Sequence, residues 1–228
     1  MKKQYSSESG NVLLFILIAV VLIGILTVAM RGSGDSDQKI DDEKMSLKVS
    51  QTMSYVRNVE AGIKTLLNDK GLSETEMLFA HDLAHADYGT IVALNQAQQL
   101  FDYDGANVVY QTPVDGINDG TNWEFMGQTH APGVGSSDRS DLLLVLPNVT
   151  QAFCEKVNEY VGYGAGVIPT DSSECVYVTT ARYDTGDQFD DVSPNTMDEG
   201  TFVTPAHKAC VQCVATGDYH FYSVVLDR

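Results

Sequence analysis

Basic residues are scarce in this sequence. Its 228 residues include 14 lysines and arginines against 31 aspartates and glutamates, which gives a formal net charge of -17. A nucleic-acid-binding protein needs a basic face for the phosphates, and a globular body that docks on anionic lipid needs one too. The composition therefore argues against both, and we interpret the acidity as a source of solubility outside the cytoplasm.

The sequence also lacks the motifs of common catalytic sites. It contains no Gly-x-Ser-x-Gly, no phosphate-binding loop and no dinucleotide-binding fingerprint. Carboxylates occur in pairs throughout so acidic a chain, and for that reason none of the pairs indicates a general acid–base site. We therefore expect no enzymatic activity and assign no catalytic residue.

Long hydrophobic runs are absent except for one near the N-terminus. The nineteen residues 12–30 carry no charge, and a helix of that length spans roughly 28 Å, close to the hydrocarbon thickness of a bilayer. The preceding ten residues, MKKQYSSESG, are polar and basic and end in Gly10, whereas residues 35–43 are strongly acidic. The positive-inside rule then keeps the N-terminus cytoplasmic and sends the rest of the chain across the membrane.

Three interpretations of this run compete. The apolar region of a cleaved secretory signal is about 7–15 residues long and ends at a small-residue cleavage site, so nineteen residues are too many. A plain membrane anchor is the second interpretation. The third is a prepilin-type signal, in which cleavage occurs on the cytoplasmic side of the apolar helix and leaves that helix on the mature protein.

The leader and the run together resemble the N-termini of type IV pilins and type II secretion pseudopilins. The resemblance implies cleavage after Gly10 by a prepilin peptidase and methylation of Asn11, the new N-terminal residue. It also implies that the apolar helix leaves the bilayer sideways and packs with the helices of neighbouring subunits in a filament. The side chains expected in that filament core include Val12, Phe15, Ile18, Leu22 and Ile25.

Two positions depart from the pattern of that family. Asn11 stands where most of these proteins have Phe or Met directly after the cut, and Phe15 stands where most have Glu. That Glu is thought to pair with the N-terminal amine of a neighbouring subunit, and some minor pseudopilins at filament tips lack it. The departures therefore indicate a minor or atypical subunit rather than the one that forms the shaft.

Residues 36–69 have the periodicity of a long amphipathic helix. Apolar residues recur mostly at intervals of three and four, at Ile40, Leu47, Val49, Met53, Val56, Val59, Ile63, Leu66 and Leu67. The glycines at 32–34 predict a kink or short break, after which Asp35 or Ser36 caps the new helix. Gly71 predicts its end. Pilins lay the second half of their N-terminal helix on a sheet, although an ordinary stalk helix has the same periodicity.

The remainder of the chain predicts a head with an antiparallel sheet and short helices. One helix is expected over residues 74–84, because Ser73 and Glu76 have capping-box spacing. A second is expected after a cap at Asn148 or Thr150. The inward face of this second helix is expected to carry Phe153, Val157 and Tyr160. The expected strands are 90–94, 107–112, 122–126, 142–146, 175–181, 209–214 and 219–226. Together the elements predict an α+β, pilin-like fold.

His81 and His85 have spacing that suits a metal ion. Four residues apart on the expected helix, they would share one face and could hold a metal ion. Asp82 stands where the zinc-protease motif requires Glu. Surface or capping histidines are the interpretation that we favour.

Two acidic turns, 102–107 and 115–122, cluster hard oxygen ligands of the kind that calcium prefers. The candidate ligands are Asp102, Asp104, Asp115 and Asp119. The acidic loop 183–200 is a second place for calcium. Asp-Gly and Asn-Asp-Gly are also strong hairpin-turn formers, and turns are the interpretation that we favour.

The four cysteines are Cys154, Cys175, Cys210 and Cys213. An even number in an exported chain suggests disulfides. A redox CxxC places its first cysteine at a helix N-terminus, and a zinc site needs a second CxxC; the sequence offers neither. We favour structural disulfides 154–175 and 210–213, and pairing across to the terminal hairpin remains open because four cysteines allow three connectivities.

These observations divide the chain into a cleavable leader (1–10), a transmembrane or filament-core helix (11–31), an amphipathic stem helix (35–70) and a disulfide-containing head (71–228). The resemblance implies a structural subunit of a type IV pilus-like or pseudopilus filament. Its expected location is the bacterial inner membrane, with the head in the periplasm or in a filament at the cell surface. Its expected partners are like subunits, a prepilin peptidase and the inner membrane, and we expect no nucleic acid and no cofactor other than calcium.

Two alternatives remain open. The first is an uncleaved, single-pass anchored protein with a binding or scaffold role in the periplasm. The second is an anchored metal-dependent or redox enzyme that uses His81 and His85 or the CxxC at Cys210–Cys213.

Overall fold

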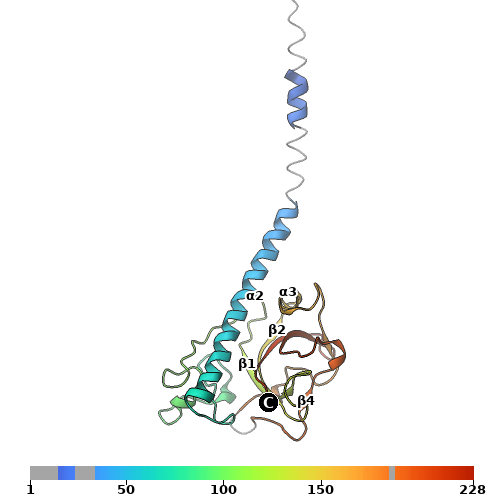
Figure 1. Cartoon of the computed structure of the whole chain (residues 1–228). Coiled ribbons are helices and arrows are strands. Elements are labelled where there is room, and N and C mark those ends of the chain that lie inside the picture. The colour runs from blue at the N-terminus through green and yellow to red at the C-terminus, as the bar shows by residue number, and fades with distance from the viewer. Residues whose placement is uncertain (1–14, 24–33, 185–187) are drawn as a thin grey trace, which may run out of the picture. The chain divides into compact units, whose positions relative to one another are not determined.

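The computed structural model describes residues 15–23, 34–184 and 188–228 (Figure 1). Contacts divide the chain into two compact units, 1–44 and 45–228. The predicted leader lies outside the described residues, as do Asn11, Val12 and Ile25 of the predicted filament-core helix.

Residues 15–23 form a helical segment within the predicted filament-core helix. All of its large hydrophobic side chains are exposed, including Phe15 at 64%, Ile18 at 46% and Leu22 at 60%. In the parts of the chain that the structure describes, no helix combines the length and the hydrophobicity that crossing a membrane requires.

Helix α2 (Gly34–Lys64) and a π-helical turn, η1 (Thr65–Asp69), form the predicted stem helix. The side chains that this helix buries within the second unit include Val49, Met53, Val56, Val59, Ile63 and Leu66. Their intervals of three and four residues confirm the amphipathic prediction. Gly71, in the left-handed conformation with φ 70°, ends the helix as expected.

Helix α2 contains two glycines, Gly34 at its first residue and Gly62 in its interior. Gly34 is already helical, so Asp35 and Ser36 lie inside α2 and the prediction that one of them caps it is wrong. A glycine costs only about 1 kcal/mol in a helix interior, which a helix of 31 residues tolerates. Gly62 is required by packing, because a Cβ there would collide with Val108 and Leu100.

The head contains a curved six-stranded mixed sheet in the order β3-β5-β6-β2-β1-β4. The strands are β1 (Glu124–His130), β2 (Asp141–Val149), β3 (Thr170–Asp171), β4 (Asn195–Thr196), β5 (Lys208–Cys213) and β6 (Tyr219–Leu226). The three pairs among β1, β2, β6 and β5 are antiparallel, and the edge strands β4 and β3 pair in parallel. The α+β class is therefore confirmed, with short parallel edges added to the expected antiparallel sheet.

Helix α3 (Gln151–Val161) follows β2 directly. Thr150 caps it by accepting a hydrogen bond from the N–H of Phe153, and Gly162 ends it in the left-handed conformation. The remaining short helices are η2 (Ala86–Tyr88), η3 (Gln96–Gln98), η4 (Thr179–Ala181) and η5 (Glu199–Thr201).

Both faces of the sheet are buried. Alternate residues of β2 belong to two separate cores, with Leu142, Leu144 and Leu146 in one and Leu143 and Val145 in the other. The first core includes the buried residues of α2 and α3, and the second is completed by irregular segments within 131–134 and 163–206. This double burial explains why the sequence of β2 is continuously apolar rather than alternating.

Several predicted elements are wrong. Residues 74–84 are not helical: the capping-box contact forms, with Ser73 N–H and Oγ both 2.8 Å from Glu76 Oε2, but it closes a single turn. The chain then forms an isolated parallel bridge between Leu78 and Gln99 instead of a helix. The stretches 90–94, 107–112 and 175–181 contain no strand, and their apolar residues lie in turns and irregular chain instead.

Candidate functional site

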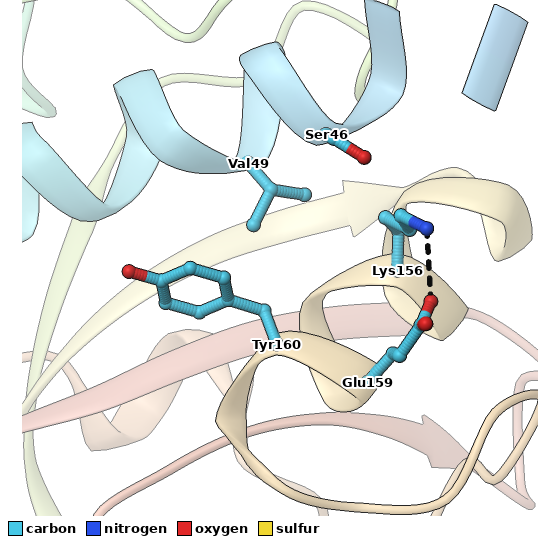
Figure 2. A pocket seen from close by; sticks show the side chains of 5 residues that line it. All are labelled: Ser46, Val49, Lys156, Glu159 and Tyr160. Atoms are coloured by element: carbon cyan, nitrogen blue, oxygen red, sulfur yellow. Dashed lines mark hydrogen bonds and ion pairs between the residues drawn. The ribbon is translucent and has the colours of Figure 1, made fainter. Parts of the chain in front are cut away.

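A groove of about 210 Å³ lies between α2 and α3 (Figure 2). Val49 and Ser46 line it from α2, and Lys156, Glu159 and Tyr160 line it from α3. Lys156 and Glu159 form an ion pair of 2.9 Å across one turn of α3. Tyr160 is 58% exposed, so the expectation that it faces inward is wrong.

The inward face of α3 is rotated by one residue from the expected stripe. It buries Phe153, Cys154, Val157 and Asn158. Asn158 is the polar member of this face, and sequence reasoning missed it. Its Oδ1 accepts the N–H of Cys210 at 2.7 Å, and its Nδ2 donates to the carbonyl oxygen of Cys210 at 2.8 Å. The Asn158 side chain therefore links α3 to β5. It forms two hydrogen bonds with the backbone of Cys210, as a residue of a neighbouring strand would.

The cysteines pair as Cys154–Cys210 and Cys175–Cys213, which corrects the favoured pairs 154–175 and 210–213. The reason is strand geometry. Cys210 and Cys213 both lie on β5, and residues three apart on a strand point to opposite faces. Cys210 accordingly joins the core under α3, and Cys213 joins the core on the other face.

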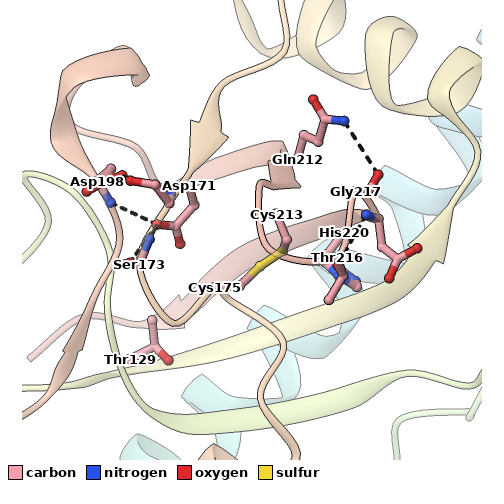
Figure 3. The surroundings of a disulfide bond; sticks show 12 residues. Thr129, Asp171, Ser173, Cys175, Asp198, Gln212, Cys213, Thr216, Gly217 and His220 are labelled. Carbon is pink, nitrogen blue, oxygen red and sulfur yellow. Dashed lines mark hydrogen bonds between the residues drawn. A yellow bond between two sulfur atoms is a disulfide. The ribbon is translucent and has the colours of Figure 1, made fainter.

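One group of potential metal ligands occurs in the described parts of the chain. The ligand atoms of Cys175, Cys213 and His220 all lie within 4.8 Å of one another, and all three residues are buried (Figure 3). The two sulfur atoms are bonded to each other, so neither is the thiolate that a metal needs. His220 Nδ1 accepts the N–H of Asn148, which leaves the ring proton on Nε2. This group is therefore arranged as a structural cluster.

Burial dominates the electrostatics of His220. It lowers the pKa of the imidazole to about 4, although Asp218 and Asp119 nearby act in the opposite direction. The ring stacks at a tilt against Tyr177, with the two centroids 5.3 Å apart. His220 is thus a neutral packing residue of β6 under ordinary conditions.

The two histidines considered as a metal pair, His81 and His85, do not share a helix face. His81 Nδ1 accepts the N–H of Leu83 at 3.1 Å, and its ring stacks on Tyr110 with centroids 4.3 Å apart. His85 Nδ1 accepts the N–H of Asp87 and caps η2. His85 is therefore exposed and in the capping role that we favoured, whereas His81 also packs against an aromatic ring.

The calcium candidates in the first acidic turn take part in local hydrogen bonds. Asp102 Oδ1 accepts the N–H of Asp104 at 2.9 Å, and the carbonyl oxygen of Asp104 accepts Lys70 Nζ at 2.8 Å. These contacts are those of a turn held against the C-terminal end of the stem helix.

Asp115 and Asp119, in the second acidic turn, line one hollow of about 360 Å³. Asp119 Oδ1 accepts the N–H of Thr121, and Oδ2 accepts Asn148 Nδ2, each at 2.9 Å. Burial raises the pKa of Asp119, but these hydrogen bonds outweigh burial and lower it overall. Neither turn belongs to a group of three close ligand side chains within the described residues. Calcium binding at these turns stays a prediction.

A buried ion-pair network lies beside β1, around the side chain of Glu124. Arg182 donates from Nε and Nη2 to the two carboxylate oxygens of Glu124, at 2.8 and 3.1 Å. Its Nη1 donates to Asp87, and Tyr88 Oη donates to Glu124. Burial, and then the charge of Glu124, raise the pKa of the Tyr88 hydroxyl. The sequence did not predict this network, because its charged residues lie far apart in an acidic chain and form no recognisable motif.

The solvent-facing side of α2 has an unusual charge. From residue 50 to residue 68 the stem exposes Ser50, Gln51, Ser54, Arg57, Asn58, Ala61, Lys64 and Asn68. This set carries two positive charges, those of Arg57 and Lys64, and the exposed Asp69 follows it directly. Glu60, at its flank, is only partly exposed and pairs with Lys208 at 2.7 Å.

Comparison of the chain with protein-family models, with curated proteins and with solved structures found no match. Any functional assignment therefore depends on the residues of this chain: an exposed apolar helix near the N-terminus, a packed stem helix and a head with two disulfides.

Proposed function

We propose that this chain is a structural subunit of a type IV pilus-like or pseudopilus filament, of the minor or atypical kind. The observation that carries the proposal is the position of Gly10, at the end of a short basic leader and directly before the uncharged run 12–30. In this proposal a prepilin peptidase cleaves after Gly10, and Asn11 becomes the methylated N-terminus. The inner membrane holds the subunit before assembly, and the head is periplasmic or on an external filament.

The exposure of residues 15–23 supports an assembly role. A helix that leaves all of its large hydrophobic side chains in contact with solvent needs lipid or other helices to cover them. The stem supports the same proposal, because α2 buries one face against its own head and leaves the other available to neighbours. The α+β head on a long helix is what a pilin-like fold requires, and that finer class is part of the proposal.

The mass of the full-length protein, expressed with a prepilin peptidase and purified, tests the proposal. We expect a chain that has lost residues 1–10 and gained one methyl group. An intact leader would contradict it.

Replacing Gly10 with leucine should block this processing, because the peptidase must accommodate the residue before the cut. Ser7→Ala, in the same leader, is the matched control and should be processed like the parent chain. Equal processing of both variants would rule out a Gly10-dependent signal.

The second candidate is an uncleaved, membrane-anchored scaffold protein of the periplasm. The length of the uncharged run 12–30, which suffices to span a bilayer without any cleavage, is the observation that favours it. It predicts the full mass, with no methyl group, in the same experiment.

A further inference from the structure

The two acidic turns of the head contain Asp-Gly sequences, at which aspartate converts to isoaspartate most readily. Glycine has no side chain to hinder attack by its backbone nitrogen on the carboxyl carbon of the preceding aspartate. The three sequences are Asp104-Gly105, Asp115-Gly116 and Asp119-Gly120. Because a glycine follows each aspartate, their local chemistry is nearly the same, and any difference among them must come from the fold.

The first sequence, 104–105, is held by the packing of its glycine. The N–H of Gly105 donates to the carbonyl oxygen of Asp102, with 3.1 Å between the two atoms. Gly105 is buried, and a Cβ on it would collide with the carbonyl oxygen of Gln99. The peptide group between Asp104 and Gly105 therefore cannot turn toward the Asp104 carboxyl group without displacing neighbouring backbone.

In the third sequence, 119–120, hydrogen bonds occupy both groups that would have to react. Asp119 accepts the N–H of Thr121 and the Nδ2 of Asn148, each at 2.9 Å. The N–H of Gly120 donates to Asn118 Oδ1 at 3.2 Å. Burial raises the pKa of Asp119, but the hydrogen bonds outweigh burial and lower the pKa overall, which favours the ionised form. Attack by the glycine nitrogen needs the neutral carboxyl group, so this site is protected as well.

The second sequence, Asp115-Gly116, has none of these restraints. Both residues are exposed, and within the described ranges neither the Asp115 carboxylate nor the Gly116 N–H takes part in a hydrogen bond. They are the central residues of a turn that one hydrogen bond closes, with 3.3 Å between Ile117 N and the carbonyl oxygen of Val114. Gly116 has φ 73°, as a type II turn requires at this position. An exposed turn with a single closing bond opens at a low free energy, which allows the two groups to meet.

We propose that Asp115 is a modification site, at which aspartate converts spontaneously to isoaspartate through a cyclic imide with Gly116. First, the nitrogen of Gly116 bonds to Cγ of Asp115 and loses its proton while Cγ loses its hydroxyl group, so one water leaves. Water then adds to the main-chain carbonyl carbon of Asp115, and the bond from that carbon to the Gly116 nitrogen breaks. The main chain now runs through the Asp115 side chain, the former main-chain carbonyl is a free carboxylate, and the mass equals that of the parent chain.

The modified turn lies beside a buried segment. Isoaspartate adds one methylene group to the main chain two residues before Ile117, which is fully buried in the first core. The carbonyl oxygen of Ile117 accepts the N–H of Thr150, the residue that caps α3, at 2.8 Å. The new carboxylate is the group on which isoaspartyl carboxyl methyltransferases act, so an enzyme of that class is the partner that this site would take. The inference does not depend on the proposed function.

Ageing of the purified full-length protein tests the site. The protein is kept in detergent at physiological temperature and mildly acidic pH for several weeks. Its peptides are then fragmented by electron transfer, which distinguishes isoaspartate from aspartate, and an isoaspartyl methyltransferase with a labelled methyl donor measures the total. We expect several times more isoaspartate at 115 than at 104 or 119. Equal amounts at the three positions, or none at 115, would overturn the proposal.

The unfolded chain is the control for local sequence. In urea, with the disulfides reduced, the three Asp-Gly sequences lose the contacts that distinguish them and should form isoaspartate at similar rates. An undiminished preference for 115 in urea would show that the sequence selects the site and that the fold does not, which would refute the argument.

Variants of Asp115 supply the internal controls. Asp115→Glu keeps the charge but needs a larger ring that closes far more slowly, so the product at 115 should disappear. Asp104→Glu is the matched change in the other turn and should leave the product at 115 unchanged. Asp115→Asn forms the same imide by losing ammonia, which leaves more readily than water, and should raise the amount of isoaspartate. No increase in Asp115→Asn would show that the turn prevents ring closure, and the proposal would then be wrong.

Discussion

A single buried side chain, that of Asn158, completes the edge of β5. Strand β3 pairs with β5 only at Gln212 and Cys213, so the backbone groups of Cys210 on that side have no strand partner. The Asn158 amide supplies both a donor and an acceptor to them. A buried backbone group without a hydrogen-bond partner lowers the stability of the fold. One asparagine on an otherwise apolar helix face therefore stabilises the head.

Asn158→Leu should therefore destabilise the head by about 2–4 kcal/mol, because it leaves the N–H and carbonyl of Cys210 buried and unpaired. Urea unfolding followed by circular dichroism measures the loss. Asn58→Ala, on the exposed side of α2, is the control and should change the unfolding free energy by less than about 0.5 kcal/mol. A loss for Asn158→Leu as small as that of the control would contradict the role assigned to the amide.

His220 should make the stability of the head depend on pH. Because burial lowers its pKa from 6.5 to about 4, the unfolded chain binds the proton more readily than the folded chain between those values. The free energy of unfolding is therefore not reduced by His220 above about pH 6.5. It decreases by up to about 3 kcal/mol as the pH falls from 6.5 toward 4. The measurement is the unfolding free energy from pH 7 to pH 4.

His220→Asn is the matched variant for this experiment. Its amide oxygen can still accept the N–H of Asn148, but it does not titrate. Carboxylates titrate in both proteins, so the difference between the two pH profiles isolates the histidine. Profiles of equal slope would show that His220 is not the responsible group.

At the scale of the element, strongly patterned segments were predictable and weakly patterned ones were not. Strand β6 coincides with the predicted 219–226, and α3 ends where Gly162 indicates, because turn residues and caps act locally. The predictions for 74–84 and 107–112 were wrong, because the conformations of these segments depend on residues far along the chain. Leu78, for example, pairs with Gln99. Local propensity cannot register contacts of that kind.

The disulfides lie between these two cases. Which residues are bonded was predictable from the even count, but the favoured pairing was not correct. The strand predicted for 209–214 already argued against a bond between Cys210 and Cys213, since two cysteines three apart on a strand point to opposite faces. Choosing between Cys154 and Cys175 as the partner of Cys210 required the position of α3, which only the folded structure supplies.

Removing the bond between α3 and β5 should weaken the head more than any surface change. The Cys154–Cys210 bond spans 56 residues, for which chain entropy predicts about 4 kcal/mol. The double variant Cys154→Ala, Cys210→Ala should lose stability on that scale in urea unfolding, and the Cys175–Cys213 bond should still form. Peptide mapping without reduction checks the pairing, and a Cys154–Cys175 peptide from the parent chain would contradict it.

At the scale of the whole molecule, the unit of residues 45–228, which joins most of the stem helix to the head, carries its own folding information. Every residue of the two buried cores lies within 45–228. A protein that consists of residues 45–228 should therefore be monomeric and unfold in one cooperative transition, with both disulfides formed. Sedimentation and urea unfolding measure these properties. Aggregation, or a gradual loss of structure, would indicate that residues 45–228 need the preceding residues to fold.

The crossed disulfides have a consequence for proteolysis. Residues 176–209 lie inside both covalent loops, the one closed by Cys154 and Cys210 and the one closed by Cys175 and Cys213. A protease that cuts once in this stretch leaves two fragments held together by two bonds, so the nicked chain keeps its full mass, plus one water, until it is reduced. With pairs 154–175 and 210–213, the same cut would have released the terminal hairpin strands from any covalent link to the stem.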